Sequence, residues 1–116
     1  MPDDNKDIQV TYDPTAVPEW VIDPIKVPIG KGKLGVIRWH RNPANAPWTF
    51  VRINEVPANW TQRVKHHGAE LEVKDPNKFA NSYIYTITIA YAGVEHTSPF
   101  AKILEVDPPI IMNEGS

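Results

Sequence analysis

Apolar and polar residues alternate along most of this chain, in short runs that turn residues separate. The clearest run covers residues 83–91, where nearly every side chain is aromatic or β-branched. Such residues fit the pleated surface of a β-strand, and a period of two is typical of strands. The Ala92-Gly93 pair that follows is a tight-turn signal, so we expect a hairpin with a returning strand over about 95–106.

Twelve prolines separate these runs and leave few gaps long enough for a helix. Proline breaks helix interiors and cannot donate a hydrogen bond to a sheet. The apolar run 20–27 is itself interrupted by Asp23-Pro24, which favours an edge position or a bulge. Short runs bounded by turn residues are typical of sandwiches and barrels. Further strands are expected at 8–12, 34–41, 48–53 and, as a last short run, 110–112.

The alternation also predicts which side chains are buried. In the run 69–74 it places Leu71 and Val73 inside, and it places Glu70 and Glu72 on a solvated face. The same reasoning, applied to the other strands, gives an expected core. That core consists of Ile37, Trp39, Phe50, Leu71, Val73, Tyr85, Ile87 and Ile89.

One segment interrupts the β pattern. Asn59 is suited to cap a helix, Gln62 stands three residues later, and Gly68 stands where a helix would end. These signals predict a short helix over 60–67, and an irregular strand is the alternative. The remaining runs need two layers to bury their apolar faces, and clean alternation favours antiparallel pairing.

The sequence therefore predicts an all-β protein, an antiparallel two-sheet β-sandwich with seven or eight strands and one short helix near 60–67. A length of 116 residues suits one domain of ordinary size. We expect a single domain over 1–116, with flexible tails at 1–7 and 113–116.

Four short motifs carry a resemblance to known domains. They are Ile37-Arg38-Trp39, Trp48-Thr49-Phe50, the run 83–87 and Asp107-Pro108-Pro109-Ile110. Over residues 34–113 the chain resembles small bacterial β-sandwich domains of immunoglobulin-like or cupredoxin-like architecture, most of which have no assigned function. The resemblance implies a fold and no chemistry. The cysteine ligand of blue-copper cupredoxins and the immunoglobulin disulfide are both absent, while Tyr83 stands where immunoglobulin-like folds often place a tyrosine corner.

Composition narrows the classes of function. A net charge of −2 argues against a nucleic-acid binder, which usually presents a strongly basic face. The absence of cysteine excludes a disulfide framework, thiolate metal sites and a cysteine nucleophile. No secretory signal or membrane span is seen, so we expect a cytoplasmic protein with neither nucleic-acid nor membrane partners.

Histidine is the commonest metal-ligating side chain, which makes the histidines metal candidates. Adjacent histidines on a strand or helix point in different directions, so the pair His66-His67 needs a third histidine to converge with it. Solvated surface histidines are the alternative. The candidates are His40, His66, His67 and His96.

Tryptophans offer a second candidate site. A flat exposed ring can stack on the C–H face of a sugar while nearby polar groups satisfy its hydroxyls. Trp39 and Trp48 fit strand patterns and are expected in the core, whereas the places of Trp20 and Trp60 are open. The binding candidates are Trp20, Trp48 and Trp60, together with Asn45 in the turn-rich loop 42–47.

No recognisable catalytic set is present. Glu70 and Glu72 share a strand face, but a solvated face explains them without catalysis. The turn 30–33 lacks the spacing of a phosphate-binding loop, and no nucleophile-elbow motif occurs. We therefore expect a protein that is not an enzyme and has no cofactor.

The leading hypothesis is a non-enzymatic interaction or structural module. Its partner would be an unidentified protein, and an exposed edge strand makes a homodimer plausible. The contact regions expected from composition are the loop 42–47 and the segment 59–68. The alternative is a carbohydrate-binding module that uses exposed tryptophans.

Overall fold

The computed structural model describes residues 2–100 and 107–116, and in them the chain is all β, as predicted. Eleven strands and one single-turn 3-10 helix make up the elements of these residues. They are β1 (Asp3–Tyr12), β2 (Trp20–Asp23), β3 (Lys26–Ile29), β4 (Leu34–Arg41), β5 (Trp48–Asn54), β6 (Thr61–Lys65), η1 (His66–Gly68), β7 (Glu70–Asp75), β8 (Ala80–Ile84), β9 (Thr86–Tyr91), β10 (Val94–Thr97) and β11 (Ile110–Glu114).

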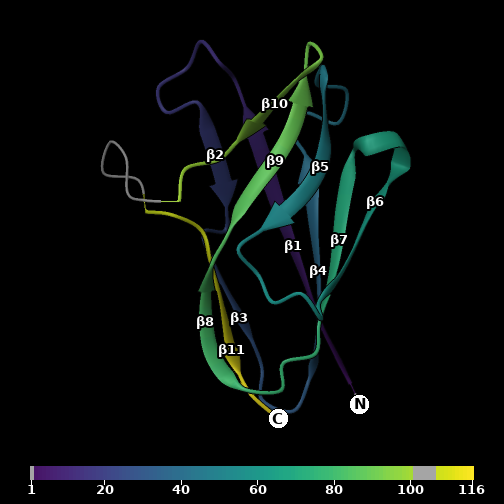
Figure 1. Cartoon of the computed structure of the whole chain (residues 1–116), viewed down its shortest axis with the longest axis vertical. Coiled ribbons are helices and arrows are strands. Elements are labelled where there is room, and N and C mark those ends of the chain that lie inside the picture. Colours follow the sequence, from purple (N-terminus) through teal and green to yellow (C-terminus); the bar gives the residue numbers. More distant parts are fainter. Residues whose placement is uncertain (1, 101–106) are drawn as a thin grey trace.

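The strands form one five-stranded sheet and two three-stranded sheets (Figure 1). The five-stranded sheet has the order β2-β1-β4-β7-β6, and the smaller sheets have the orders β10-β9-β5 and β3-β11-β8. Most neighbours are antiparallel, but β1 runs parallel to β4 and β11 runs parallel to β3. The expectation of purely antiparallel pairing was therefore wrong at these two places.

Two long extended runs each serve two sheets, which is why the expected count of seven or eight strands was too low. The run 20–29 breaks at Pro24, so β2 pairs with β1 while β3 pairs with β11. The run 80–91 breaks at Tyr85, so β8 pairs with β11 while β9 pairs with β5 and β10. In each run the second strand follows directly on the first (Figure 1). The predicted hairpin is present as β9 and β10, and residues 101–106 of its expected return strand lie outside the described residues.

The core is one cluster of buried residues drawn from all three sheets. All eight residues of the expected core are buried, and they belong to one cluster. At its centre the Trp39 indole Nε1 donates a hydrogen bond of 3.0 Å to the Tyr85 hydroxyl. Burial raises the pKa of Tyr85 far above its usual value, although the bond from Trp39 opposes this. The two rings meet nearly edge to face, with centroids 5.3 Å apart.

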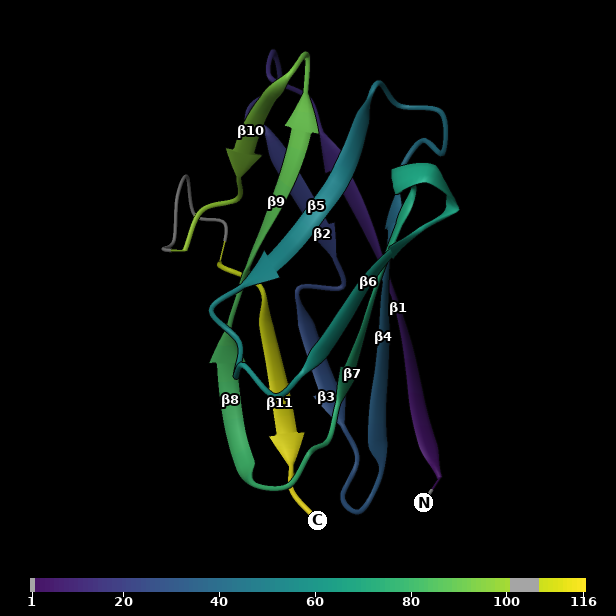
Figure 2. The same ribbon diagram turned by 45° about the vertical axis from the view of Figure 1, so that its right-hand side comes forward.

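The predicted helix over 60–67 was wrong. Residues 61–65 form β6, an edge strand that pairs antiparallel with β7, and η1 closes the hairpin between them (Figure 2). His66, His67 and Gly68 have φ angles of 54°, 55° and 91°. These left-handed values are incompatible with a continuing α-helix. Pairing with β7 thus overrides the local capping signals.

Gln62 explains part of this preference for a strand. Its side-chain Oε1 accepts a hydrogen bond of 2.9 Å from the backbone N–H of Ile53, and its Nε2 donates to the Ile53 carbonyl at 3.4 Å. The amide thus makes to β5 the bonds that a neighbouring strand would make. One side chain joins the edge of the five-stranded sheet to the edge of a smaller sheet.

Replacing Gln62 with alanine should lower the free energy of unfolding by about 1 kcal/mol, because a partly buried backbone N–H loses its acceptor. Urea unfolding monitored by tryptophan fluorescence measures the change. Arg63→Ala on the exposed strand β6 is the matched control, and its effect should stay within about 0.5 kcal/mol. Equal effects in the two variants would contradict a clamp at Gln62.

Buried polar side chains connect β7, the turn before β4 and the end of β11. Asn77 donates through Nδ2 to the carbonyls of Gly30 and Lys33, at 2.9 and 3.0 Å. Its Oδ1 accepts from the N–H of Gly115 at 2.9 Å. Asn77 is 2% exposed. One side chain therefore holds three segments that are far apart in sequence.

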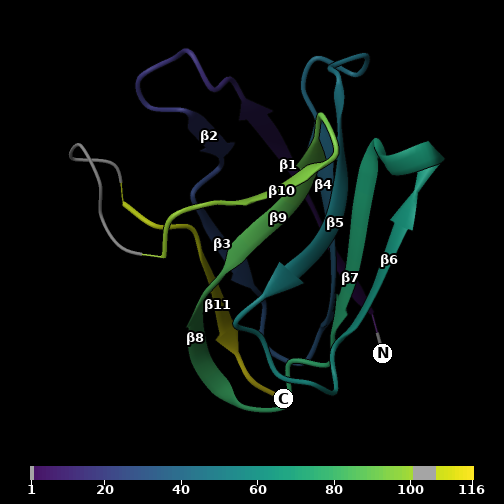
Figure 3. The same ribbon diagram turned by 45° about the horizontal axis from the view of Figure 1, so that its top comes forward.

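The segments expected to be flexible tails take part in the sheets. Residues 3–7 form the first half of β1 and pair with residues 34–38 of β4. Asn113 and Glu114 belong to β11, which lies between β3 and β8 (Figure 3). In the part of the chain that the structure describes, no helix has the length and hydropathy needed to cross a membrane.

Candidate functional site

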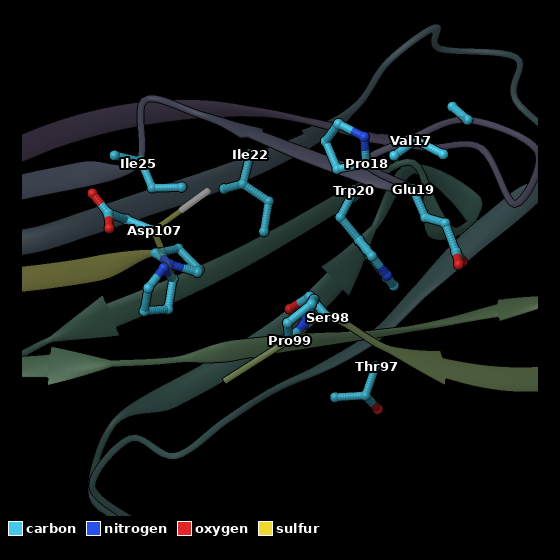
Figure 4. A pocket seen from close by; sticks show the side chains of 13 residues that line it. Val17, Pro18, Glu19, Trp20, Ile22, Ile25, Thr97, Ser98, Pro99 and Asp107 are labelled. Atoms are coloured by element: carbon cyan, nitrogen blue, oxygen red, sulfur yellow. The ribbon is translucent and has the colours of Figure 1, made fainter. Parts of the chain in front are cut away.

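A mainly apolar pocket of about 320 Å³ opens beside β2. One wall comes from the loop before β2 and from β2 itself, and the opposite wall from residues 97–99 and 107–109. Figure 4 shows Trp20 and Ile22 on the first wall facing Ser98 and Pro99 on the second. Because proline fixes its own backbone φ, Pro18, Pro99, Pro108 and Pro109 give this pocket a stiff lining.

Trp20 is the half-buried aromatic residue of this pocket. Its ring packs on Tyr12, with centroids 4.7 Å apart and the planes tilted by 51°. Tyr12 also stacks near His96 at 5.4 Å. Tyr12 thus covers part of the Trp20 ring, while the indole lines the pocket.

Exposed apolar side chains stand at the pocket and next to it. Val17, on its wall, is 80% exposed, and Phe100, next to the lining residue Pro99, is 55% exposed. Single exposed apolar residues are ordinary, but two at one concave apolar site suit a binding surface.

The polar groups of the pocket serve mainly to hold its walls. The Ser98 hydroxyl accepts a hydrogen bond of 2.9 Å from the backbone N–H of Ile87, and the Ser98 N–H donates to the Ile87 carbonyl. This bonding anchors the second wall to β9. Glu19, Thr97 and Asp107 add polar atoms to the lining. The arrangement suits binding of an apolar group with a few polar contacts beside it.

The structure separates the other sequence-predicted binding residues. Trp48 and Trp60 are 2% and 8% exposed, so neither offers an open ring face to a sugar. Trp48 packs edge to face on Phe50, with centroids 5.0 Å apart. Asn45 is exposed in the loop between β4 and β5, away from the lining residues of the pocket. Of the four binding candidates, only Trp20 lies at the pocket.

The four histidines do not converge. His40 and His66 both approach Glu70, at 3.4 and 3.8 Å, and His40 Nε2 also lies 2.8 Å from an Asp7 oxygen. His67 is exposed on η1, and His96 stands against Tyr12 on β10. Within residues 2–100 and 107–116, no group of three or more His, Asp or Glu side chains has a geometry that could hold a metal ion.

The expectation that Glu70 and Glu72 face solvent was wrong, because both are less than 10% exposed. Long basic side chains cover them. Arg38 Nε donates to Glu72 at 3.0 Å, and Lys65 Nζ does so at 3.3 Å. Burial raises the pKa of Glu72, but the hydrogen bonds from Lys65 and Arg38 outweigh it, and the pKa is lowered overall. This outer face is an ion-pair network that stabilises the sheet.

Glu72 should make the fold sensitive to acid. Its folded-state pKa lies below the ordinary 4.5, so its ion pairs stabilise the protein above that pH and are lost as the pH falls through the lowered value. Glu72→Gln should therefore be less stable than the wild type by about 1 kcal/mol at pH 7, with the gap closing toward pH 3. Thermal melts from pH 7 to 3 measure this, and a constant gap would contradict the assignment.

Comparison with protein-family models finds no match, and comparison with curated proteins finds none either. Sequence reasoning named Trp20 but missed Val17, Ile22 and Ile25, which also line the pocket. The available signal was the proline-rich loop 13–19 before Trp20, in which two prolines flank the exposed Val17.

Proposed function

We propose that this protein is a non-enzymatic binding module that uses the Trp20 pocket to hold an apolar side chain of a partner protein. The observation that carries the proposal is the stiff apolar pocket with exposed apolar residues at it and next to it. Interfaces of proteins typically place aromatic or aliphatic anchors in such pockets. A pocket with prolines in its walls is largely pre-formed, which reduces the entropic cost of binding.

We also propose that the scaffold is a β-sandwich of immunoglobulin-like or cupredoxin-like type. In this interpretation the two three-stranded sheets act as one layer, because β8 leads directly into β9 and each belongs to one of them. The five-stranded sheet is the second layer. Sandwiches present loops at their ends, and the loop before β2 contributes the Trp20 pocket in this way.

Small amides test the pocket directly. N-acetyl-leucine amide and N-acetyl-tryptophan amide, titrated into labelled protein, should give saturable shifts of the Trp20 indole and Ile22 methyl signals. Val17→Asp places a charge on the pocket wall and should weaken both titrations at least tenfold. Val94→Asp is the matched control, because Val94 is 55% exposed on β10 and does not line the pocket. Absent titrations, or equal weakening by both variants, would refute the proposal.

The partner can be a second copy of this chain. Sedimentation velocity across a hundredfold range of protein concentration distinguishes the two cases. A monomer–dimer equilibrium that Val17→Asp shifts toward monomer identifies self-association through the pocket. A monomer at every concentration, with the amide titrations intact, identifies a different protein as the partner.

Carbohydrate binding is the second candidate, and the half-buried Trp20 beside Glu19 and Thr97 is the observation that favours it. Sugar rings need one open aromatic face and nearby hydrogen-bonding groups. A panel of neutral oligosaccharides in the same titration separates the candidates. Saturation by a sugar that Trp20→Ala abolishes would favour carbohydrate over an apolar side chain.

A further inference from the structure

A second cavity has a volume of about 140 Å³. The turn 57–60 and the segment 75–79 form its sides, and Tyr83 and Asn113 complete it. It shares no lining residue with the Trp20 pocket. Its polar groups are not involved in the function proposed above, so their chemistry is a separate question.

Two acceptor oxygens on the lining residues of this cavity have no hydrogen-bond partner within residues 2–100 and 107–116. They are Oδ2 of Asp75, whose side chain is fully buried, and Oδ1 of Asn113, which is 8% exposed. The other atoms of both groups are used: Asp75 Oδ1 accepts from the Asn77 N–H at 2.8 Å and from Asn113 Nδ2 at 2.9 Å. That bond fixes the Asn113 amide so that its oxygen stays an acceptor. Buried polar groups of native proteins are nearly always paired.

The charge of Asp75 also lacks compensation among its hydrogen-bond donors, since Asn77 and Asn113 are both uncharged. Burial raises the pKa of Asp75, and the two hydrogen bonds lower it less. A buried carboxylate without a cationic partner is costly, and a donor that carries positive charge would relieve this cost. The chemistry of the site therefore calls for a cation with N–H or O–H donors.

The remaining walls select between kinds of cation. Trp60 and Tyr83 meet edge to face with centroids 5.0 Å apart, and Phe79 beside them is 74% exposed. Aromatic faces attract organic cations and supply no ligand to a metal ion. The described residues also contain no cluster with the three or more carboxylate or histidine groups of a metal site. An ammonium group carries N–H donors and a positive charge, and aromatic walls suit it.

We propose that this cavity binds an ammonium group on a slender alkyl chain, with Asp75 Oδ2 and Asn113 Oδ1 accepting two of its N–H bonds. Trp60, Tyr83 and Phe79 would surround the alkyl part. A free alkylamine and the end of a lysine side chain share this chemistry. Lys78 lies at the cavity as well, and its own ammonium is the internal competitor for the site.

Methylammonium chloride is the probe, and tetramethylammonium chloride is its control because it carries charge without N–H donors. Chemical shifts of the Asn113 amide and Trp60 indole should saturate with methylammonium and remain unsaturated with tetramethylammonium at equal ionic strength. Equal responses to methylammonium and tetramethylammonium would overturn the proposal.

N-acetyl-lysine methylamide is a third ligand that distinguishes the two sources of the ammonium group. Binding at least tenfold tighter than that of methylammonium identifies a lysine side chain, and weaker binding identifies a free amine.

Asp75→Asn tests the carboxylate while keeping the acceptor that Asn77 and Asn113 use. It should weaken methylammonium binding at least tenfold and leave a cooperative thermal melt. Asp23→Asn is the control with the same change of charge on an exposed side chain, and it should leave binding unchanged. Unaltered binding in Asp75→Asn would overturn the proposal.

Lys78→Gln keeps the test decisive should Asp75→Asn fail to fold. Removing the internal competitor should leave methylammonium binding equal or tighter. A wild-type protein that shows no titration, together with a variant that gains one, would mean that Lys78 fills the cavity itself. That result would overturn binding of an external amine. None of these outcomes depends on the Trp20 pocket, so the two proposals fail separately.

Discussion

Replacing Asn77 with alanine should remove about 4 kcal/mol from the free energy of unfolding. About 3 kcal/mol follows from losing the three side-chain hydrogen bonds to Gly30, Lys33 and Gly115, at about 1 kcal/mol each. About 1 kcal/mol more follows from the φ of 54° at this position, which asparagine tolerates better than alanine. Equilibrium urea unfolding measures the total.

A glycine at position 77 separates the two contributions. Asn77→Gly loses the same hydrogen bonds but has no Cβ to oppose the left-handed backbone, so it should be more stable than Asn77→Ala by about 1 kcal/mol. Asn45→Ala, in an exposed loop, is the control and should change stability by less than about 0.5 kcal/mol. A loss below 1 kcal/mol in Asn77→Ala would show that water replaces these bonds.

The Trp39–Tyr85 hydrogen bond should give the second largest effect. Tyr85→Phe leaves the buried Trp39 N–H without an acceptor and should destabilise the fold by about 2 kcal/mol. Trp39→Phe leaves the Tyr85 hydroxyl unpaired and also creates a void, so about 3 kcal/mol is expected. Chemical unfolding of each variant measures the losses.

The double variant tests whether the two side chains act as a pair. Its loss should be smaller than the sum of the single losses by about 1 kcal/mol, because neither orphan group remains. Additive losses would mean that the 3.0 Å contact contributes nothing beyond packing. The pair Val94→Ala and Trp39→Phe is the reference for additivity, since Val94 is exposed on β10.

The features that could be predicted from the sequence are those that depend on the local alternation of apolar and polar residues. Inward positions in β4, β7 and β9 follow the period of two, so the six expected core residues on these strands could be named in advance. Partner choice has no such local signal. The parallel pairing of β1 with β4, and the division of single runs between sheets at Pro24 and Tyr85, depend on contacts between segments far apart in sequence.

Two local signals were outweighed by distant contacts. The capping residues around Asn59 and Gln62 suit a helix, but Gln62 bonds to Ile53 and β6 pairs with β7. The alternation in β7 assigned Glu70 and Glu72 to solvent, but long side chains from neighbouring strands cover them. The hydrophobic period and the strand propensity describe one strand by itself. The burial of a side chain also depends on the side chains of the adjacent strands.

The candidate site was predictable only in part. Trp20 was predicted as a binding candidate because no clear strand pattern placed it in the core. Most of the other lining residues of its pocket lie in loops, which have no periodicity to predict them from. The orphan oxygens of Asp75 and Asn113 had no sequence signal, since Asp75-Pro76-Asn77 resembles ordinary turn chemistry. Such sites form where segments from different parts of the chain meet.

The position of β11 constrains how this chain can fold during its synthesis. β11 is the central strand of its sheet, and among the described strands β3 and β8 pair there only with β11. During synthesis β3 emerges some eighty residues before β11, so its backbone donors and acceptors wait for that strand while those residues are added. The nascent chain therefore carries an unfinished sheet edge with Val27 and Ile29 on it. A pause in translation before residue 110 would prolong that state and increase the time available for aggregation or chaperone binding.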